Sequence, residues 1–211
     1  EKTDATVKAV PSETGFLVAA PDRGAMGNDR VRLAFKALSE KHPAQLVFIT
    51  DKDSAKYVDQ ALGQLKDERV TEAVVLPLFL SRANPKFDLL TGFVDKRQKI
   101  MPMRYGRAFG DSYLAVEMLA GRFKRLRETD VAVIAGNGAT DAQNRDAITR
   151  DLKRIVEKAR QGVFKGEVKT VVWPVRGSAE YENLNEESWR EVRERQGQGQ
   201  RKHFNLGREL D

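Results

Sequence analysis

The 211-residue chain has no cysteine and only two histidines. The absence of cysteine excludes disulfide bonds, thiolate metal sites, iron–sulfur clusters and cysteine nucleophiles. Two histidines leave little room for a histidine-rich metal centre, which needs several imidazoles around one ion. No apolar run approaches the roughly 18 residues of a membrane-spanning helix. The chain therefore has few strong metal ligands and few bases that work near neutral pH.

Charge and hydrophobicity describe a folded, basic protein. Hydrophobic residues make up 40% of the chain, which is enough for a core, and the net charge is +6. Positively and negatively charged residues are interspersed along the chain. The main interpretation of the basic excess is therefore a solvated surface, and the alternative is a phosphate or polyanion partner. Nucleic-acid binding is disfavoured, because the basic C-terminal residues lack interleaved aromatics. Those basic residues are Arg190, Arg193, Arg195, Arg201, Lys202 and Arg208.

The N-terminal residues 1–14 are polar and begin at Glu1 without a methionine. This composition predicts a flexible leader, left after removal of a targeting segment or by trimming. Together with the absence of cysteine, it favours an exported, periplasmic protein, with the cytoplasm as the alternative.

Short apolar runs alternate with segments of helical periodicity over the first 126 residues. This alternation predicts an α/β fold, in which right-handed crossovers build a parallel sheet with helices on both faces. The strands are expected at 15–20, 44–50, 71–81 and 99–106, and the helices at about 31–38, 53–65, 85–98 and 112–126.

The pattern restarts at residue 130, where 130–144 repeats the layout of 14–28. A helix with Ile148, Leu152 and Ile155 on one face and a strand at 169–178 follow, and then a charged helix capped by Asn185 around Trp189 and Val192. The second lobe thus has fewer strands than the first. Its incomplete sheet could pair with another chain as a homo- or hetero-oligomer. The predicted parts are a leader at 1–14, lobes at 15–128 and 129–196, and a polar basic tail at 197–211.

Ligands of parallel α/β sheets bind outside the carboxyl ends of the strands. This rule selects the loop after Ala20, the segment from Ser81, the loop after Gly136 and the segment from Arg176.

The chain resembles the class II tetrapyrrole chelatases, in particular the sirohydrochlorin cobaltochelatase and ferrochelatase branch. FLVAAPDRGAMGN at 16–28 follows the layout of an apolar strand, H-G-S-R and a later asparagine. PLFLSRANPKFD at 77–88 is similar to the family's third strand and the loop after it. RYGRAFGDSYLAVEMLAGRFKRL at 104–126 resembles the end of the family's first lobe. The resemblance covers about 15–176 and implies two chelatase-like lobes, the second reduced, around a tetrapyrrole site.

The family's metal-handling histidines are missing. The first falls on Ala20 and the second on Asn84 or Pro85, while GNG in the repeat places Asn137 near where a GHG of the family would stand. Neither His42 nor His203 lies at an equivalent place. Neutral imidazole suits metal delivery and proton acceptance because its pKa is near 7, and alanine or asparagine cannot accept a proton there. The resemblance therefore implies a retained scaffold without the family's catalysis.

Candidate ligand-binding residues lie at the predicted strand ends, where guanidinium groups suit the carboxylates of an acidic tetrapyrrole or a phosphate. They are Arg23, Asn28, Ser81, Arg82, Asn137 and Arg176.

Asp22 and Asp88 are the candidate ligands for a divalent metal. As hard oxygen donors they favour magnesium, calcium or manganese. Asp141, Glu180 and Glu182 are further carboxylates near the strand ends, and turns, helix caps or surface positions are the alternative for these residues. Trp173 and Phe79 either stack on a flat ligand or pack in the core, and the core is the main interpretation.

The sequence as a whole predicts a chelatase-like protein that binds a tetrapyrrole, a metal or another anionic small ligand between its lobes without inserting metal. An active chelatase using carboxylates, and an interaction or assembly module, are the alternatives.

Overall fold

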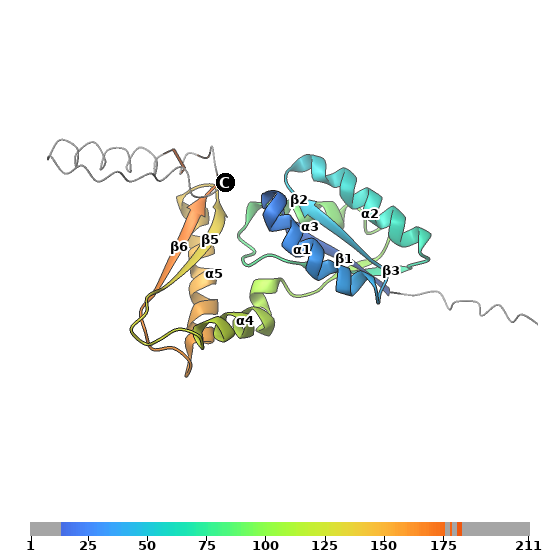
Figure 1. The fold of residues 1–211 in the computed structure, drawn as a ribbon. Helices are drawn as coiled ribbons and strands as arrows, with labels where there is room; N and C mark the ends of the chain where they lie inside the picture. The colour runs from blue at the N-terminus through green and yellow to red at the C-terminus, as the bar shows by residue number, and fades with distance from the viewer. Residues whose placement is uncertain (1–13, 176–177, 179–180, 183–211) are drawn as a thin grey trace, which may run out of the picture.

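The computed structural model describes residues 14–175, 178 and 181–182. Its helices and strands alternate along the chain as the sequence predicts (Figure 1). Their bounds are β1 (Thr14–Pro21), α1 (Gly24–Ser39), β2 (Ala44–Ile49), α2 (Ala55–Asp67), β3 (Glu72–Pro77), α3 (Pro85–Asp95), β4 (Met103–Tyr105), α4 (Tyr113–Phe123), β5 (Ala132–Ala139), α5 (Ala142–Arg160) and β6 (Val168–Pro174), with short 3-10 turns η1 (Lys52–Ser54) and η2 (Phe109–Asp111).

The first lobe contains a parallel sheet in the order β2-β1-β3-β4. β1 is central and pairs in parallel with β2 and β3. The chain runs from β1 to β2 at one edge and then crosses back past β1 to β3 on its other side. Parallel neighbours need helical connections, and α1, α2 and α3 supply them. The α/β class with helix-flanked parallel sheets is thus confirmed.

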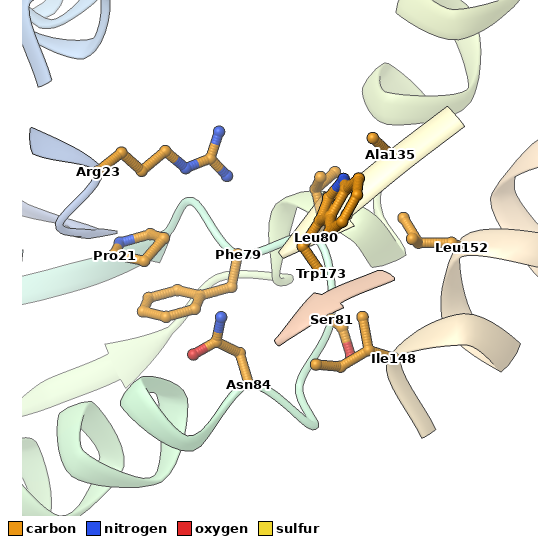
Figure 2. A pocket seen from close by; sticks show the side chains of 11 residues that line it. Pro21, Arg23, Phe79, Leu80, Ser81, Asn84, Ala135, Ile148, Leu152 and Trp173 are labelled. Carbon is orange, nitrogen blue, oxygen red and sulfur yellow. The ribbon is translucent and has the colours of Figure 1, made fainter. Parts of the chain in front are cut away.

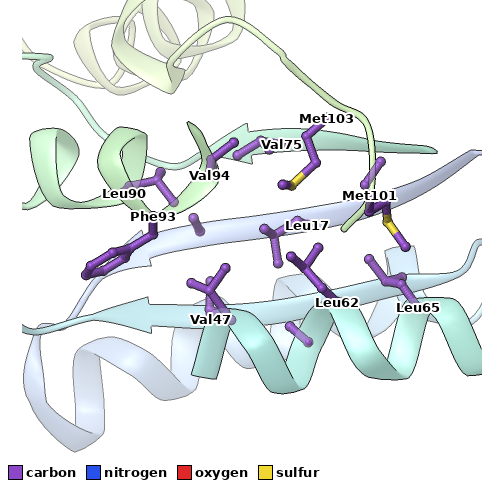
Figure 3. Packing of buried hydrophobic residues seen from close by; sticks show 14 of the residues in the cluster. Leu17, Val47, Leu62, Leu65, Val75, Leu90, Phe93, Val94, Met101 and Met103 are labelled. Carbon is purple, nitrogen blue, oxygen red and sulfur yellow. The ribbon is translucent and has the colours of Figure 1, made fainter. Parts of the chain in front are cut away.

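The main core lies where α2 and α3 pack on this sheet (Figure 3). α2 buries Val58, Ala61, Leu62 and Leu65, which recur at helical spacing. The sheet contributes buried apolar side chains from β1, β2 and β3 to the same cluster. This burial is the main source of the first lobe's stability.

The second lobe is a parallel βαβ unit formed by β5, α5 and β6. Asp141 caps α5 by accepting a hydrogen bond from the backbone N–H of Asn144 at 2.8 Å, as the cap interpretation of this residue expects. α4 packs on α5, and Phe123 at its end stacks on Phe164 with ring centroids 5.3 Å apart. α4 therefore connects the four-stranded sheet to the two-stranded one.

Several predicted bounds are wrong. The strand expected at 71–81 ends at Pro77, since proline has no backbone N–H to continue the ladder. The strand expected at 99–106 shrinks to β4, and the helix expected at 112–126 ends at Phe123. α1 begins at Gly24, well before the predicted start near residue 31, because its first two turns bury only Asn28 and carry no apolar stripe.

No helix of the described residues is long and apolar enough to span a bilayer.

Candidate ligand-binding site between the lobes

A cavity of about 490 Å³ lies at the carboxyl ends of the parallel strands. Its walls come from residues that follow β1, β2, β5 and β6 and from the first turn of α3. Both lobes therefore contribute to it. Strand ends and helix N-termini meet at this edge of an α/β sheet, which makes it the usual place for a ligand.

Three cations line this cavity, together with two carboxylates. Arg23 follows β1, Lys52 lies in η1 and Lys86 lies in the first turn of α3. The Lys86 ammonium donates a hydrogen bond to the backbone carbonyl of Asp22 at 3.2 Å. The side chains of Arg23 and Lys52 are exposed and have no ion pair with any residue that the structure describes. An anionic ligand would thus meet unpaired positive charge.

A second cavity of about 170 Å³ adjoins the first and shares Pro21, Arg23 and Asn84 with it (Figure 2). Phe79 is buried and packs edge-to-face on Phe87, so the core interpretation of Phe79 is confirmed. The same interpretation of Trp173 is wrong, because that side chain is 54% exposed at the cavity wall. It points out of a two-stranded sheet whose outer face carries no helix among the described residues. An exposed indole at a cavity can stack on a flat ligand.

Asn84 lies between the two cavities and lines both. Its Oδ1 accepts from the backbone N–H of Lys86 at 3.0 Å, which caps α3 and fixes the amide plane. The structure describes no acceptor for its Nδ2. A Cβ added to Gly138, where φ is +107°, would lie 2.8 Å from that nitrogen. The positive φ favours glycine at this position, where the second lobe comes close to the Asn84 side chain.

Asp22 lines the larger cavity, but its oxygens are already engaged. Oδ1 accepts from Asn28 Nδ2 at 2.7 Å and from the backbone N–H of Gly24 at 3.0 Å. Oδ2 accepts from the Thr50 hydroxyl at 3.0 Å. These hydrogen bonds, with that from Asn28 the largest cause, lower the pKa of Asp22. A carboxylate with a lowered pKa is a poor base near neutral pH, so this residue is suited to holding the loop.

The Asp22→Asn variant should lose less stability on acidification than the wild-type chain. A carboxyl whose folded pKa is depressed stabilises the fold above its unfolded pKa and loses that contribution as the pH falls through the folded value. The usual value is 3.8, and the folded pKa of Asp22 lies below it. Urea unfolding at pH 6 and at several values below pH 4 measures the difference between the two proteins. Equal pH dependence would contradict a lowered pKa for Asp22.

Ser81 and Arg82 connect the lobes in this structure. The buried Ser81 hydroxyl donates to Asp151 Oδ2 at 2.6 Å and accepts from the backbone N–H of Ala83. Asp111 accepts from Arg82 Nε and from Arg154 Nη2, each at 2.7 Å. Burial alone would raise the pKa of Asp111, but the hydrogen bonds and charges of these two guanidinium groups outweigh it and lower the pKa. Ser81 still lines the smaller cavity, whereas Arg82 lines neither.

The remaining candidates divide into those near the cavities and those elsewhere. Asn28 is buried, and its Oδ1 accepts from the backbone N–H of Arg23 at 3.0 Å. Asp88 is exposed in the first turn of α3 and lines neither cavity. Asn137 lies in β5 opposite Trp173, and Arg176 lies outside the described residues. Glu182 is exposed, and Glu180 also lies outside the described residues.

His42 lies far from the cavities along the sheet. Its ring contacts Phe16 edge-to-face at 5.5 Å, next to the amino ends of β1 and β2. The cavities open at the opposite, carboxyl ends. His203 lies outside the described residues. Within the described part of the chain there is no group of three or more histidine, cysteine, aspartate or glutamate side chains that could hold a metal ion.

Sequence reasoning missed Lys52, Lys86 and Thr50. All three line the larger cavity, at the ends of β2 and the start of α3. The carboxyl-end rule would have found Thr50 and Lys52 if it had been applied to the second strand as well. The sequence indicated Lys86 less clearly. Asn84 and Pro85 mark the start of a helix, and Lys86 follows them in its first turn, which lies at the same edge of the sheet.

The chain has parallel sheets flanked by helices and a cation-lined cavity at the carboxyl ends of their strands, an arrangement consistent with the class II chelatase fold. The sequence profile of the CbiX family matches residues 16–126, over half of the chain. The chain belongs to the CbiX family, whose members are chelatase-like and related to sirohydrochlorin cobaltochelatases. No curated protein and no solved structure is significantly similar to it.

Proposed function

We propose that this protein binds an acidic tetrapyrrole in the cavities between its lobes and does not insert metal into it. The observation that carries the proposal is the group of Arg23, Lys52 and Lys86 around the larger cavity, next to the exposed indole of Trp173. Guanidinium and ammonium groups pair with the carboxylates on the rim of such a macrocycle, and the indole stacks on its face. Membership of the CbiX family supports a tetrapyrrole as the ligand.

The side chains at the cavities support binding without metal insertion. Insertion requires a group that delivers the metal and groups that accept two pyrrole protons. The resemblance sets the family's histidine positions at Ala20, which is buried in β1, and at Asn84 or Pro85, where Asn84 Oδ1 is fixed as a helix cap. Asp22 does not replace them, because its hydrogen bonds lower its pKa and occupy both oxygens. This arrangement argues against Asp22 as the proton-accepting carboxylate of an active chelatase.

Titration with sirohydrochlorin tests the binding proposal. We expect a saturable change in the absorption spectrum of the tetrapyrrole and a rise in the Tm of the protein as ligand is added. Binding should weaken as salt is raised, because exposed cations provide much of the attraction. A spectrum and a Tm that stay unchanged with sirohydrochlorin and with other acidic tetrapyrroles would reject the proposal.

A further inference from the structure

The beginning of α1 contacts Arg23, a cation that lines both cavities. Of the residues of α1, all of which the structure describes, Asn28 alone is buried, so this helix adds little to the apolar core. Figure 2 shows the Arg23 side chain extended, with its guanidinium group turned toward the side of the cavity on which Trp173 lies. The contacts that hold Arg23 in this position come from Gly27 and Asn28.

Asn28 links the backbone of Arg23 to the side chain of Asp22. Its Oδ1 accepts from the backbone N–H of Arg23 at 3.0 Å, and its Nδ2 donates to Asp22 Oδ1 at 2.7 Å. Asn28 is only 8% exposed, and hydrogen bonds in such a place are stronger than in water. Asp22 also accepts from the backbone N–H of Gly24, whose φ of +75° favours glycine. The backbone on both sides of Arg23 is therefore held in one conformation.

Gly27 leaves the space that the Arg23 side chain occupies. A Cβ added to Gly27 would lie 2.6 Å from Arg23 Cβ and 3.7 Å from its Cδ. Carbon atoms in contact lie about 3.5–4.0 Å apart, so an alanine here would overlap Arg23 Cβ. That atom is bonded directly to the backbone and cannot move away by a side-chain rotation. Alanine at this position would therefore displace Arg23 as a whole.

The second lobe holds its own cavity loop in a similar way. Asn144 lies in the first turn of α5, and its Oδ1 accepts from the backbone N–H of Thr140 at 3.3 Å. Thr140 lines the larger cavity, as Arg23 does. In both lobes an asparagine near the start of the helix thus holds the backbone of a loop residue at the cavity.

We propose that Gly27 and Asn28 are positioning residues for Arg23, which they hold between the two cavities so that its guanidinium group meets a carboxylate of the ligand. Neither residue lines a cavity, so each acts on the ligand through Arg23. A freely moving arginine would have to be immobilised when the ligand binds, which reduces affinity. Asn28 therefore has a different role from the direct ligand contact that the sequence predicts. The inference rests on the proposed function, because it takes an acidic tetrapyrrole as the ligand.

A double-mutant cycle in the full-length chain, measured by titration with sirohydrochlorin, tests the proposal. Arg23→Gln should raise the Kd about five-fold, as expected for the loss of one partly exposed charged contact. Gly27→Ala and Asn28→Ala should each raise the Kd about three-fold while Arg23 is present. In the Arg23→Gln background each should change it by less than about 1.5-fold, because the side chain through which they act is gone.

Gly63→Ala is the matched control for Gly27→Ala. Gly63 lies within α2, lines neither cavity, and an added Cβ there meets no atom within 4 Å. Its Kd should equal that of the wild-type protein in both backgrounds. Circular dichroism and the Tm show which variants are folded. If Asn28→Ala does not fold, Gly27→Ala completes the cycle alone, since it removes no side-chain hydrogen bond.

The cycle separates this proposal from the proposed function. A merely structural role of Gly27 and Asn28 would weaken binding equally with and without the Arg23 guanidinium group. Equal effects in both backgrounds, or a wild-type Kd in both single variants, would overturn the positioning role while leaving tetrapyrrole binding intact. A wild-type protein that binds neither sirohydrochlorin nor another acidic tetrapyrrole would reject the proposed function, and this inference with it.

Discussion

Replacing Arg23, Lys52 and Lys86 together with glutamine is expected to weaken sirohydrochlorin binding by about 100-fold. Each cation lines the cavity, and none forms an ion pair with a carboxylate of the described residues, although Asp22 and Asp51 line the same cavity and the charge of Lys86 helps to lower the pKa of Asp22. A partly exposed charge-assisted hydrogen bond contributes about 1 kcal/mol, so three of them correspond to a change of roughly two orders of magnitude in Kd. The Kd values follow from absorbance titrations of wild-type and variant at the same ionic strength.

The control removes the same charge elsewhere. Lys41, Lys66 and Arg125 are exposed and line neither cavity, and their triple replacement with glutamine lowers the net charge equally. We expect its Kd to stay within about three-fold of wild type, because long-range attraction is screened by salt. If both triple variants weakened binding equally, general charge attraction would explain the affinity and the proposed site would be wrong.

Gly110→Ala should destabilise the fold by about 4 kcal/mol, at the upper end of single-substitution effects. An added Cβ would lie 1.8 Å from the Leu80 carbonyl oxygen and 2.5 Å from its carbon. Both are backbone atoms, so the segment Phe79–Ser81 must move. That segment lines the smaller cavity and carries the Ser81–Asp151 hydrogen bond between the lobes. For a chain of this size we expect a fall in Tm of about 12 °C, measured by thermal unfolding.

Gly121→Ala is the matched control for this prediction. Gly121 lies within α4, and a Cβ there meets no atom within 4 Å. Alanine should stabilise the helix by about 0.5 kcal/mol because it restricts the unfolded chain more than glycine does. If both variants kept the wild-type Tm, the close approach of η2 to Leu80 would not exist.

The alternation of strands and helices was predictable because their apolar residues follow two distinct periods. α2 shows this most clearly, since Val58, Ala61, Leu62 and Leu65 form one buried stripe. The start of α1 was not predictable, because its first two turns bury one asparagine and present exposed side chains such as Met26. A helix that buries few apolar side chains against the sheet has no apolar periodicity from which its start could be predicted.

The site was predictable in position and only partly in composition. The carboxyl-end rule located Arg23 at a cavity, because strand ends in parallel sheets share one edge. It could not show that Arg82 pairs with Asp111, or that Ser81 bonds to Asp151, which is far from it in the sequence. These partners meet only when the lobes pack. A polar residue at a strand end can either hydrogen-bond to the other lobe or bind a ligand. The amino-acid sequence alone does not distinguish these two roles.

Cobalt insertion into sirohydrochlorin is the most direct test of the central claim, that this member of the CbiX family binds a tetrapyrrole without acting on it. The measurement mixes the purified protein, sirohydrochlorin and Co²⁺ and follows the absorption of the metallated product over time. The account predicts that the protein binds the macrocycle while product forms no faster than in buffer. Insertion that is several-fold faster with folded protein, and returns to the buffer rate after heat denaturation, would contradict it.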